Sequence, residues 1–222
     1  MKTLYESLLD DFDTLNDKID PREEIKRFLE ENYKSSDTFE ISVEPNKNGY
    51  YVVTSKRRTV KAMKQIKQLT NELFVFENIF DFNCSRCHNL TSLKGAPKAI
   101  KGDFYCYHCK NLKSLEGAPR LINTTIGDFD CCGCEKLTSL KGAPEVVGFF
   151  CCRDCENLTS LEGAPKKIIF DFDCEECEKL TSLKGAPKEV GRDFYSRGNT
   201  FTEEDIRKVS NIKGNVIIQS KL

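Results

Sequence analysis

The sequence predicts an α+β protein: a repeat solenoid with a parallel β-sheet of short strands, an N-terminal α/β cap and a C-terminal helix–strand cap. The main observation is internal repetition, because a Cys-x-x-Cys motif recurs five times and its first cysteines lie 22, 25, 21 and 22 residues apart. A near-identical phrase, such as NLTSLKGAP or KLTSLKGAP, follows each motif. A period of just over twenty residues is typical of solenoids, in which each repeat forms one coil. The second observation is a change of composition, since residues 1–58 contain no cysteine.

Each repeat is expected to contribute one strand, which ends at the first cysteine of its motif. Side chains alternate across a strand, so in GDFYC (102–106) Phe104 and Cys106 are expected to face inward. The same reading applies to the other coils. The five motifs are Cys84/Cys87, Cys106/Cys109, Cys131/Cys134, Cys152/Cys155 and Cys174/Cys177.

The pattern continues beyond the last cysteine motif. GRDFYS places Ser196 at the first-cysteine position, and NIKGNVII places Ile218 there. Between them, FTEEDIRKVS predicts a short helix with Thr202 as its N-cap. We therefore expect three parts: a helical plus β-hairpin cap domain over 1–58, the solenoid over 59–195 and a capping coil over 196–222.

Two roles are open for the start of the chain. Leu4, Leu8 and Phe12 recur at helical spacing and predict a short amphipathic helix. This helix can pack as part of a cap on the open end of the solenoid. Alternatively, the first 15 residues can serve as a recruitment or packaging tag.

The rest of the N-terminal part reads as a helix followed by a hairpin. Asp20 and Pro21, followed by two acidic residues, form a good helix start. FEISVE (39–44) and YYVVTS (50–55), joined by PNKNG, predict a β-hairpin. Residues 60–80 are consistent with a helix or a degenerate repeat, and we favour the repeat because its apolar spacing matches Leu-x-x-Leu elsewhere.

The repeat unit F-x-C-x-x-C-x-x-L-x-x-L resembles the core pattern of leucine-rich repeats, over roughly residues 60–222. LTSL-x-G-A-P is similar to a phrase of short repeats in secreted bacterial effectors. Some of those effectors carry a catalytic ubiquitin ligase domain after the repeats; nothing similar follows here, and no such activity is expected. The resemblance implies a leucine-rich-repeat-like solenoid and says almost nothing about function.

The whole chain also resembles repeat proteins of gut bacteria and their phages, many of which begin with a phrase similar to MKTLYESLL. That resemblance implies a phage-encoded protein in the host cytoplasm that binds and inhibits a host defence factor.

Composition excludes several classes of function. The chain has 34 Lys and Arg against 35 Asp and Glu, for a net charge of −1, so no basic footprint for nucleic acid is expected. No apolar run is long enough for a membrane span, and the acidic start is unlike a signal peptide, so we expect a cytoplasmic protein. With two histidines and no evident base–nucleophile pair, an enzyme is not expected, although His88 and His108 lie near cysteines.

The paired cysteines allow a metal reading and a core reading. Four thiolates from two neighbouring pairs can form a closed zinc or iron–sulfur site. However, Ser196 and Ile218 replace the first cysteine in later coils, and isoleucine cannot be a ligand. Free cysteine behaves as a small buried apolar group, so we expect these cysteines in the core and predict no metal or cofactor. Cys132 and Cys151 lie outside the pairs and are expected to be exposed, and therefore reactive or in an interface.

Outward strand positions align into three rows on the face that we expect to be concave. The first row contains mainly aspartates: Asp81, Asp103, Asp128, Phe149, Asp171 and Asp193. The second row contains Asn83, Tyr105, Asp130, Cys151, Asp173 and Tyr195. The third row contains Ser85, Tyr107, Cys132, Arg153, Glu175 and Arg197.

The aspartate row has two interpretations. Each carboxylate can accept backbone N–H groups in a turn, or the row can form an acidic surface for a basic protein partner or a cation. We expect a non-enzymatic protein-binding module whose site centres on the break at Phe149, since aromatic and Arg residues are enriched in binding hot spots. Capture of a small molecule or metal by this acidic, cysteine-rich face is the alternative. The predicted site comprises Tyr105, Tyr107, Asp128, Asp130, Cys132, Phe149, Cys151, Arg153, Asp171 and Asp173.

Overall fold

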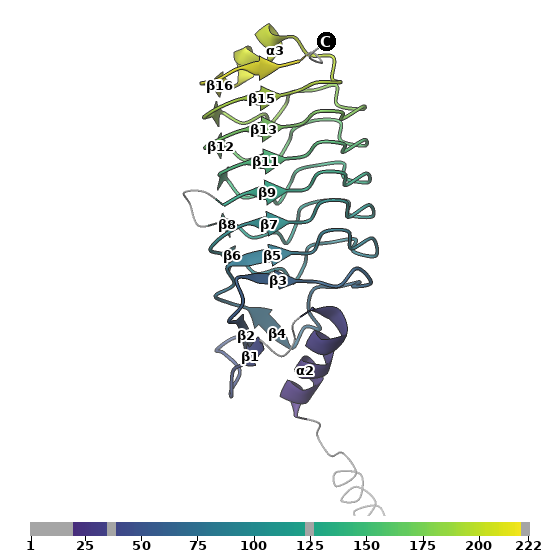
Figure 1. The fold of residues 1–222 in the computed structure, drawn as a ribbon, viewed down its shortest axis with the longest axis vertical. Helices are drawn as coiled ribbons and strands as arrows, with labels where there is room; N and C mark the ends of the chain where they lie inside the picture. The colour runs from purple at the N-terminus through teal and green to yellow at the C-terminus, as the bar shows by residue number, and fades with distance from the viewer. Residues whose placement is uncertain (1–19, 35–38, 123–126, 219–222) are drawn as a thin grey trace, which may run out of the picture.

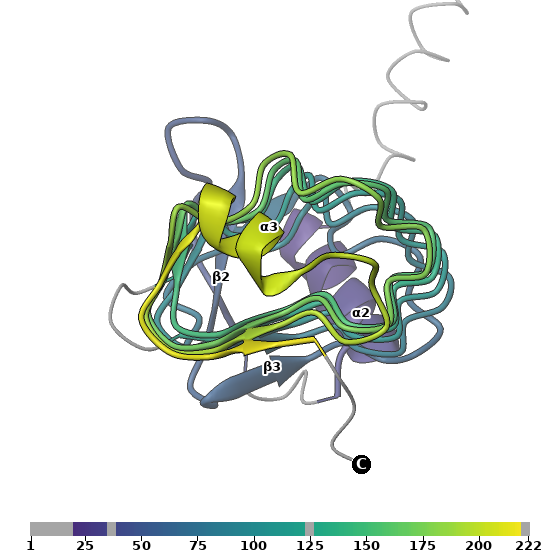
Figure 2. The same cartoon turned by 90° about the horizontal axis from the view of Figure 1, so that it is seen from above.

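The computed structural model describes residues 20–34, 39–122 and 127–218, and it is a stack of coils joined by parallel strands (Figure 1). The repeat solenoid with parallel sheets that the sequence predicts is confirmed. Figure 1 shows the coils in a nearly straight column, and Figure 2 shows successive coils largely superposed when viewed along it. The helix expected over Leu4–Phe12 and the proposed tag lie outside the described residues.

Eight short strands, one from each coil, form the main sheet in the order β17-β15-β13-β11-β9-β7-β5-β3. Neighbouring strands pair in parallel and in the same register, so that Phe104 lies beside Phe82 on one side and Phe129 on the other. The strands are β3 (Thr59–Lys61), β5 (Asp81–Asn83), β7 (Phe104–Tyr105), β9 (Phe129–Asp130), β11 (Phe150–Cys151), β13 (Phe172–Asp173), β15 (Phe194–Tyr195) and β17 (Val216–Ile217).

A second set of two-residue strands, which the sequence analysis did not predict, links another part of each coil. It forms one sheet in the order β10-β12-β14-β16 and a separate pair, β6-β8. The strands are β6 (Ala99–Ile100), β8 (Leu121–Ile122), β10 (Val146–Val147), β12 (Lys167–Ile168), β14 (Glu189–Val190) and β16 (Asn211–Ile212). Parallel pairing sets the same spacing of about 4.8 Å wherever it occurs. Two parts of each coil are therefore held at equal spacing, which explains why the main sheet forms a straight strip and not the concave face that we expected.

The core is a column of repeated side chains. Phe82, Phe104, Phe129, Phe150 and Phe172 stack with ring centroids 5.1 to 5.9 Å apart. The leucines of the repeated phrase are mostly buried beneath them. Burying each such side chain contributes about 1.5–3 kcal/mol, so the repeated residues are those that hold neighbouring coils together.

All ten paired cysteines are buried, which confirms the core reading for their position. The second cysteine of most motifs also donates its S–H to the first cysteine's carbonyl in the preceding coil. Cys109 Sγ lies 3.1 Å from Cys84 O, and Cys177 Sγ lies 3.1 Å from Cys152 O. In the coil of β15, which has no cysteine pair, Asn199 Nδ2 makes the equivalent bond, 2.8 Å from the carbonyl oxygen of Cys174. The second cysteine is thus a hydrogen-bond donor as well as an apolar group.

The Gly-Ala-Pro turn lets each coil lie against the one before it. Gly142 has a φ of 99°, and a Cβ atom there would lie 2.3 Å from Leu115 O. Such a φ is rare for residues with a side chain. The repeated glycine is therefore required both by its backbone conformation and by the close approach of the preceding coil.

The N-terminal part contains α2 (Pro21–Asn32) and a β-hairpin of β1 (Phe39–Ile41) and β2 (Tyr51–Ser55). Asp20 caps α2, because its side chain accepts a hydrogen bond from the N–H of Arg22. Strand β2 also pairs in parallel with β4 (Phe74–Phe76).

Residues 60–80 contain strands and no helix, in agreement with the degenerate-repeat interpretation. Ile66 and Leu69 are fully buried there, as the leucines of the regular repeats are.

Helix α3 (Glu203–Val209) lies across the other end of the stack (Figure 2). Thr202 and Asp205 form a capping box, as the sequence suggested for the N-cap. No helix in the described part of the chain is long and apolar enough to cross a membrane.

Candidate functional site on the strand face

The outward side of the main sheet, called the strand face below, carries the three rows defined above. Strand pairing aligns Phe150 with Phe129 and Phe172, and Cys151 with Asp130 and Asp173. The residue before each of these phenylalanines belongs to the first row, and the residue two places after Cys151, Asp130 or Asp173 belongs to the third row, so these rows align in the same register. The rows inferred from the repeat are thus the rows that the strand register produces.

The first row is a hydrogen-bonded ladder of carboxylates. The N–H of Asp103 donates to Asp81 Oδ1 at 3.0 Å, and the N–H of Asp128 donates to Asp103 Oδ1 at 2.9 Å. The N–H of Asp193 donates to Asp171 Oδ1 at 2.9 Å in the same way. Each aspartate therefore satisfies a backbone donor of the next coil, which supports the structural interpretation of this row.

Phe149 interrupts the ladder. Its N–H donates to Asp128 Oδ1 at 3.1 Å, so it receives the bond from the preceding coil. Its side chain has no acceptor to offer to the backbone N–H of Asp171. The ring is half-buried, not fully exposed as we expected. The coil of β11 therefore lacks the carboxylate hydrogen bond to the next coil, and part of an aromatic ring is exposed on the strand face instead.

The second row has a different structural role where it contains Asn or Asp. Asn83, Asp130 and Asp173 each accept, through Oδ1, the N–H of the residue two places later, at 2.9 to 3.0 Å. Burial raises the pKa of Asp130, and it raises the pKa of Asp173 to about 6. These carboxylates lie low in the surface and are poorly solvated.

Arg153 was expected to be an anchor for a partner, but the structure places it in an internal ion-pair network. Glu175 is only 2% exposed and pairs with both Arg153 and Arg197. Arg153 Nε also lies 3.4 Å from Asp173 Oδ2. Two carboxylates thus neutralise its charge, and its side chain is half-buried.

Cys132 and Cys151 lie together with Asp130. One ligand atom from each of the three residues lies within 4.8 Å of the other two. Cys132 is half-exposed, but Cys151 is only 6% exposed, so the expectation of an exposed thiol is wrong for Cys151. The thiol lies against side chains of the adjacent coil, since a ligand atom of Asp130 and one of Cys132 are within 4.8 Å of it. A hydrogen bond from Cys151 lowers the pKa of Cys132 and raises that of Cys151.

The two predicted tyrosines are half-buried on the same face. Tyr105 Oη donates to Asp103 Oδ2 at 2.8 Å, and burial is the main cause that raises the pKa of Tyr105. The ring of Tyr107 packs edge-on against His108, with centroids 5.8 Å apart. Tyr105 therefore belongs to the carboxylate ladder, and Tyr107 borders the cysteine cluster through His108.

Sequence reasoning missed the residue before the second cysteine of each motif. This position has a positive φ in successive coils, and the residues are Arg86, His108, Gly133, Asp154, Glu176 and Gly198. Each of them directly follows a residue of the third row. The sequence signal that could have found this position is its variation in charge and size from coil to coil, while the two cysteines on either side of it repeat in five coils.

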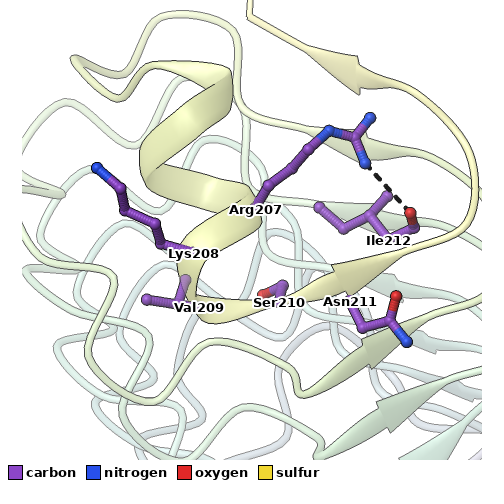
Figure 3. Close-up of a pocket in the computed structure, with 6 residues that line it drawn as sticks. All are labelled: Arg207, Lys208, Val209, Ser210, Asn211 and Ile212. Atoms are coloured by element: carbon purple, nitrogen blue, oxygen red, sulfur yellow. Dashed lines mark hydrogen bonds between the residues drawn. The ribbon is translucent and has the colours of Figure 1, made fainter.

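Two other surfaces offer less. One of them is the Lys–Glu row, in which the charge alternates from coil to coil and solvated pairs form, such as Lys184 Nζ with Glu162 Oε2 at 3.4 Å; it consists of Lys94, Glu116, Lys141, Glu162 and Lys184. A shallow pocket lies between α3 and β16 (Figure 3). There the guanidinium of Arg207 donates to Ile212 O at 3.2 Å and so closes one side of the pocket with an internal bond.

Comparison with protein-family models, with curated proteins and with solved structures finds no match to this chain.

Proposed function

We propose that the protein is a non-enzymatic binding module that recognises a protein partner through the strand face. The observation that carries this proposal is the contrast between the two sides of the main sheet. Inward positions repeat Phe and Cys from coil to coil, whereas the coil of β11 differs from both of its neighbours at all three outward positions. Variation that the core does not require is typical of a recognition surface on a solenoid.

The partner that fits this surface carries basic groups. Around Phe149 the half-buried carboxylates of Asp128, Asp130 and Asp171 lie on adjacent coils. Burial and the neighbouring Asp103 raise the pKa of Asp128, so a cation brought close to it would be stabilised. The half-buried ring supplies an apolar contact between these charges. We expect association to weaken as the salt concentration rises.

We also propose the finer description of the fold. The solenoid is of the leucine-rich-repeat type, with α2 and the hairpin as one cap and the α3–β17 segment as the other. The bonds from the second cysteines, and from Asn199, to buried carbonyl groups support this description. A phage origin, a host defence factor as partner and a cytoplasmic location remain predictions from the resemblance.

Site-specific photo-crosslinking tests the proposed binding face. A photoreactive amino acid replaces Tyr107 on the strand face or, as the matched control, Lys94 or Lys184 on the exposed Lys–Glu row. After irradiation in bacterial lysate, we expect one protein to be crosslinked from position 107 and not from positions 94 and 184, with a yield that falls at high salt. Crosslinks that arise only from positions 94 and 184 would overturn the placement of the site.

Small-molecule or metal capture is the second candidate. The convergence of Asp130, Cys132 and Cys151 favours it over other non-protein ligands, because thiol and carboxylate groups together are metal-binding chemistry.

A further inference from the structure

Two cysteines of the strand face serve no purpose in the core. The paired cysteines face inward, and several of them donate to carbonyl groups of neighbouring coils. Cys132 and Cys151 instead occupy outward positions, where other coils carry Ser, Tyr, Asn, Asp, Glu or Arg. They come from adjacent coils, and with Asp130 they bring three ligand atoms within 4.8 Å of one another.

A fourth donor borders the cluster. A Cβ atom on Gly133 would lie 2.2 Å from His108 Nδ1, so the imidazole occupies the space that a side chain at position 133 would need. His108 is half-buried, and it is near enough to Asp130 to oppose the rise that burial causes in the pKa of that carboxyl. The backbone N–H of His108 donates to Cys132 O at 2.7 Å, which fixes the two residues relative to each other.

The charges around the cluster favour a cation. Asp154 Oδ2 lies 4.0 Å from Cys132 Sγ, and the carboxylate of Asp173 is near enough to both thiols to oppose their ionisation. Arg153, on the same coil as Cys151, is a positive group whose charge is already paired with Asp173 and Glu175. Two thiolates beside these carboxylates would repel one another, and a divalent cation among them would remove that repulsion.

We propose that Asp130, Cys132 and Cys151 bind a Zn²⁺ ion, and that the side chain of His108, at the border of this cluster, turns toward the ion to become its fourth ligand. Thiolate, imidazole and carboxylate groups are the ligands that Zn²⁺ takes in proteins, and four of them complete its usual coordination. Binding releases the thiol protons, so affinity falls as the pH is lowered. This inference departs from the sequence-based expectation of no metal, which the core position of the paired cysteines had suggested.

Metal titration of the full chain tests the proposal. The protein, kept reduced with a phosphine, is titrated with Zn²⁺ against a chromogenic chelator. It is titrated separately with Co²⁺, whose absorption reports thiolate ligands. We expect one ion per chain and a thiolate-to-cobalt band. In Cys132→Ser only one thiolate remains, so the cobalt band should be clearly weaker than in the wild type. Zn²⁺ binding should weaken at least about tenfold in Cys132→Ser and about tenfold in His108→Ala.

Controls separate this site from the buried cysteines. His88→Ala changes the other histidine, which is exposed and lies outside the cluster, and should leave the affinity unchanged. Cys151→Ser should behave like Cys132→Ser; if it lowers the melting temperature, the half-exposed Cys132 decides the test. Zinc that stays bound in both cysteine variants, or wild-type binding weaker than about micromolar, would overturn the proposal. The titration uses the metal alone, so its failure would leave the proposal of a protein partner intact.

Discussion

At the scale of single residues, the row of aspartates shows how like charges can be stacked without loss of stability. Each carboxylate of the ladder accepts a backbone N–H from the next coil, as Asp103 does from Asp128. A hydrogen bond to a charged group contributes about 1.5–3 kcal/mol, which exceeds the repulsion between half-solvated charges on neighbouring coils. Asp81 adds bonds from Arg58 and Thr59 to its second oxygen, each 3.1 Å long. The row is therefore a structural feature in which Phe149 is the exception.

Asp173 is expected to make the protein more stable as the pH falls through the mildly acidic range. Burial raises its pKa to about 6, from the ordinary 3.8, although Arg153 opposes the shift. The folded state therefore binds a proton that the unfolded state releases, and stability rises as pH falls from about 7 to about 4. Asp173→Asn should raise the melting temperature at pH 7, by the equivalent of up to about 3 kcal/mol, and remove this part of the pH dependence.

Asp205 provides the opposite case for comparison. Hydrogen bonds from Thr202 lower the pKa of Asp205, so its contribution to stability is lost as the pH falls. In Asp205→Asn the melting temperature should therefore fall less steeply with decreasing pH in the acid range than it does in the wild type. Thermal unfolding followed by circular dichroism measures both variants, from about pH 2, below the lowered pKa of Asp205, to about pH 8. Parallel profiles for Asp173→Asn and wild type would contradict the assignment for Asp173.

At the scale of elements, the turn after each pair of leucines determines how closely coils approach. Gly142→Ala should lower stability by about 3 kcal/mol, because the new Cβ meets Leu115 O and the φ of 99° is strained. Gly49 is the matched control, since its φ is 81° and nothing lies within 4 Å of a Cβ there. Gly49→Ala should cost only about 1 kcal/mol. Equal melting temperatures for the two variants would show that close packing of the turn does not limit stability.

Much of this element structure could be predicted from the sequence, because each coil repeats the same inward Phe and Cys. The second set of strands was missed because its residues, such as Val146 and Val147, lie in the bridge after each Gly-Ala-Pro phrase, where the sequence differs from coil to coil and no fixed motif marks a strand. A recurring apolar position after each Gly-Ala-Pro phrase was the available signal.

The candidate site was predicted less completely, because the burial of its side chains depends on contacts between residues of different coils. Row positions followed from the register, but the cover over Cys151 and the pairing of Arg153 with Glu175 did not. Such contacts join residues more than twenty positions apart, and no local pattern specifies them. The contact of the His108 imidazole with Gly133 is another one between different coils that no local pattern specifies.

At the scale of the whole molecule, each coil is stabilised by its neighbours, so a defect in one coil weakens a junction and not the entire fold. The break at Phe149 is such a defect, since the backbone N–H of Asp171 finds no carboxylate acceptor at that position of the preceding coil. Phe149→Asp should restore the ladder and raise stability by about 1 kcal/mol, equivalent to about 2–4 °C in the melting temperature. A lower melting temperature would show that the ring stabilises the stack more than a carboxylate does.

The central claim is that the strand face around Phe149 binds a partner and that its departure from the repeat is retained for this purpose. The most direct measurement is the yield of the photo-crosslink from position 107 in Phe149→Asp and in Lys94→Ala, with the melting temperature confirming that both are folded. We predict that Phe149→Asp loses most of the crosslink while keeping or gaining stability, and that Lys94→Ala retains it. An undiminished crosslink in Phe149→Asp, together with its loss in Lys94→Ala, would contradict the claim.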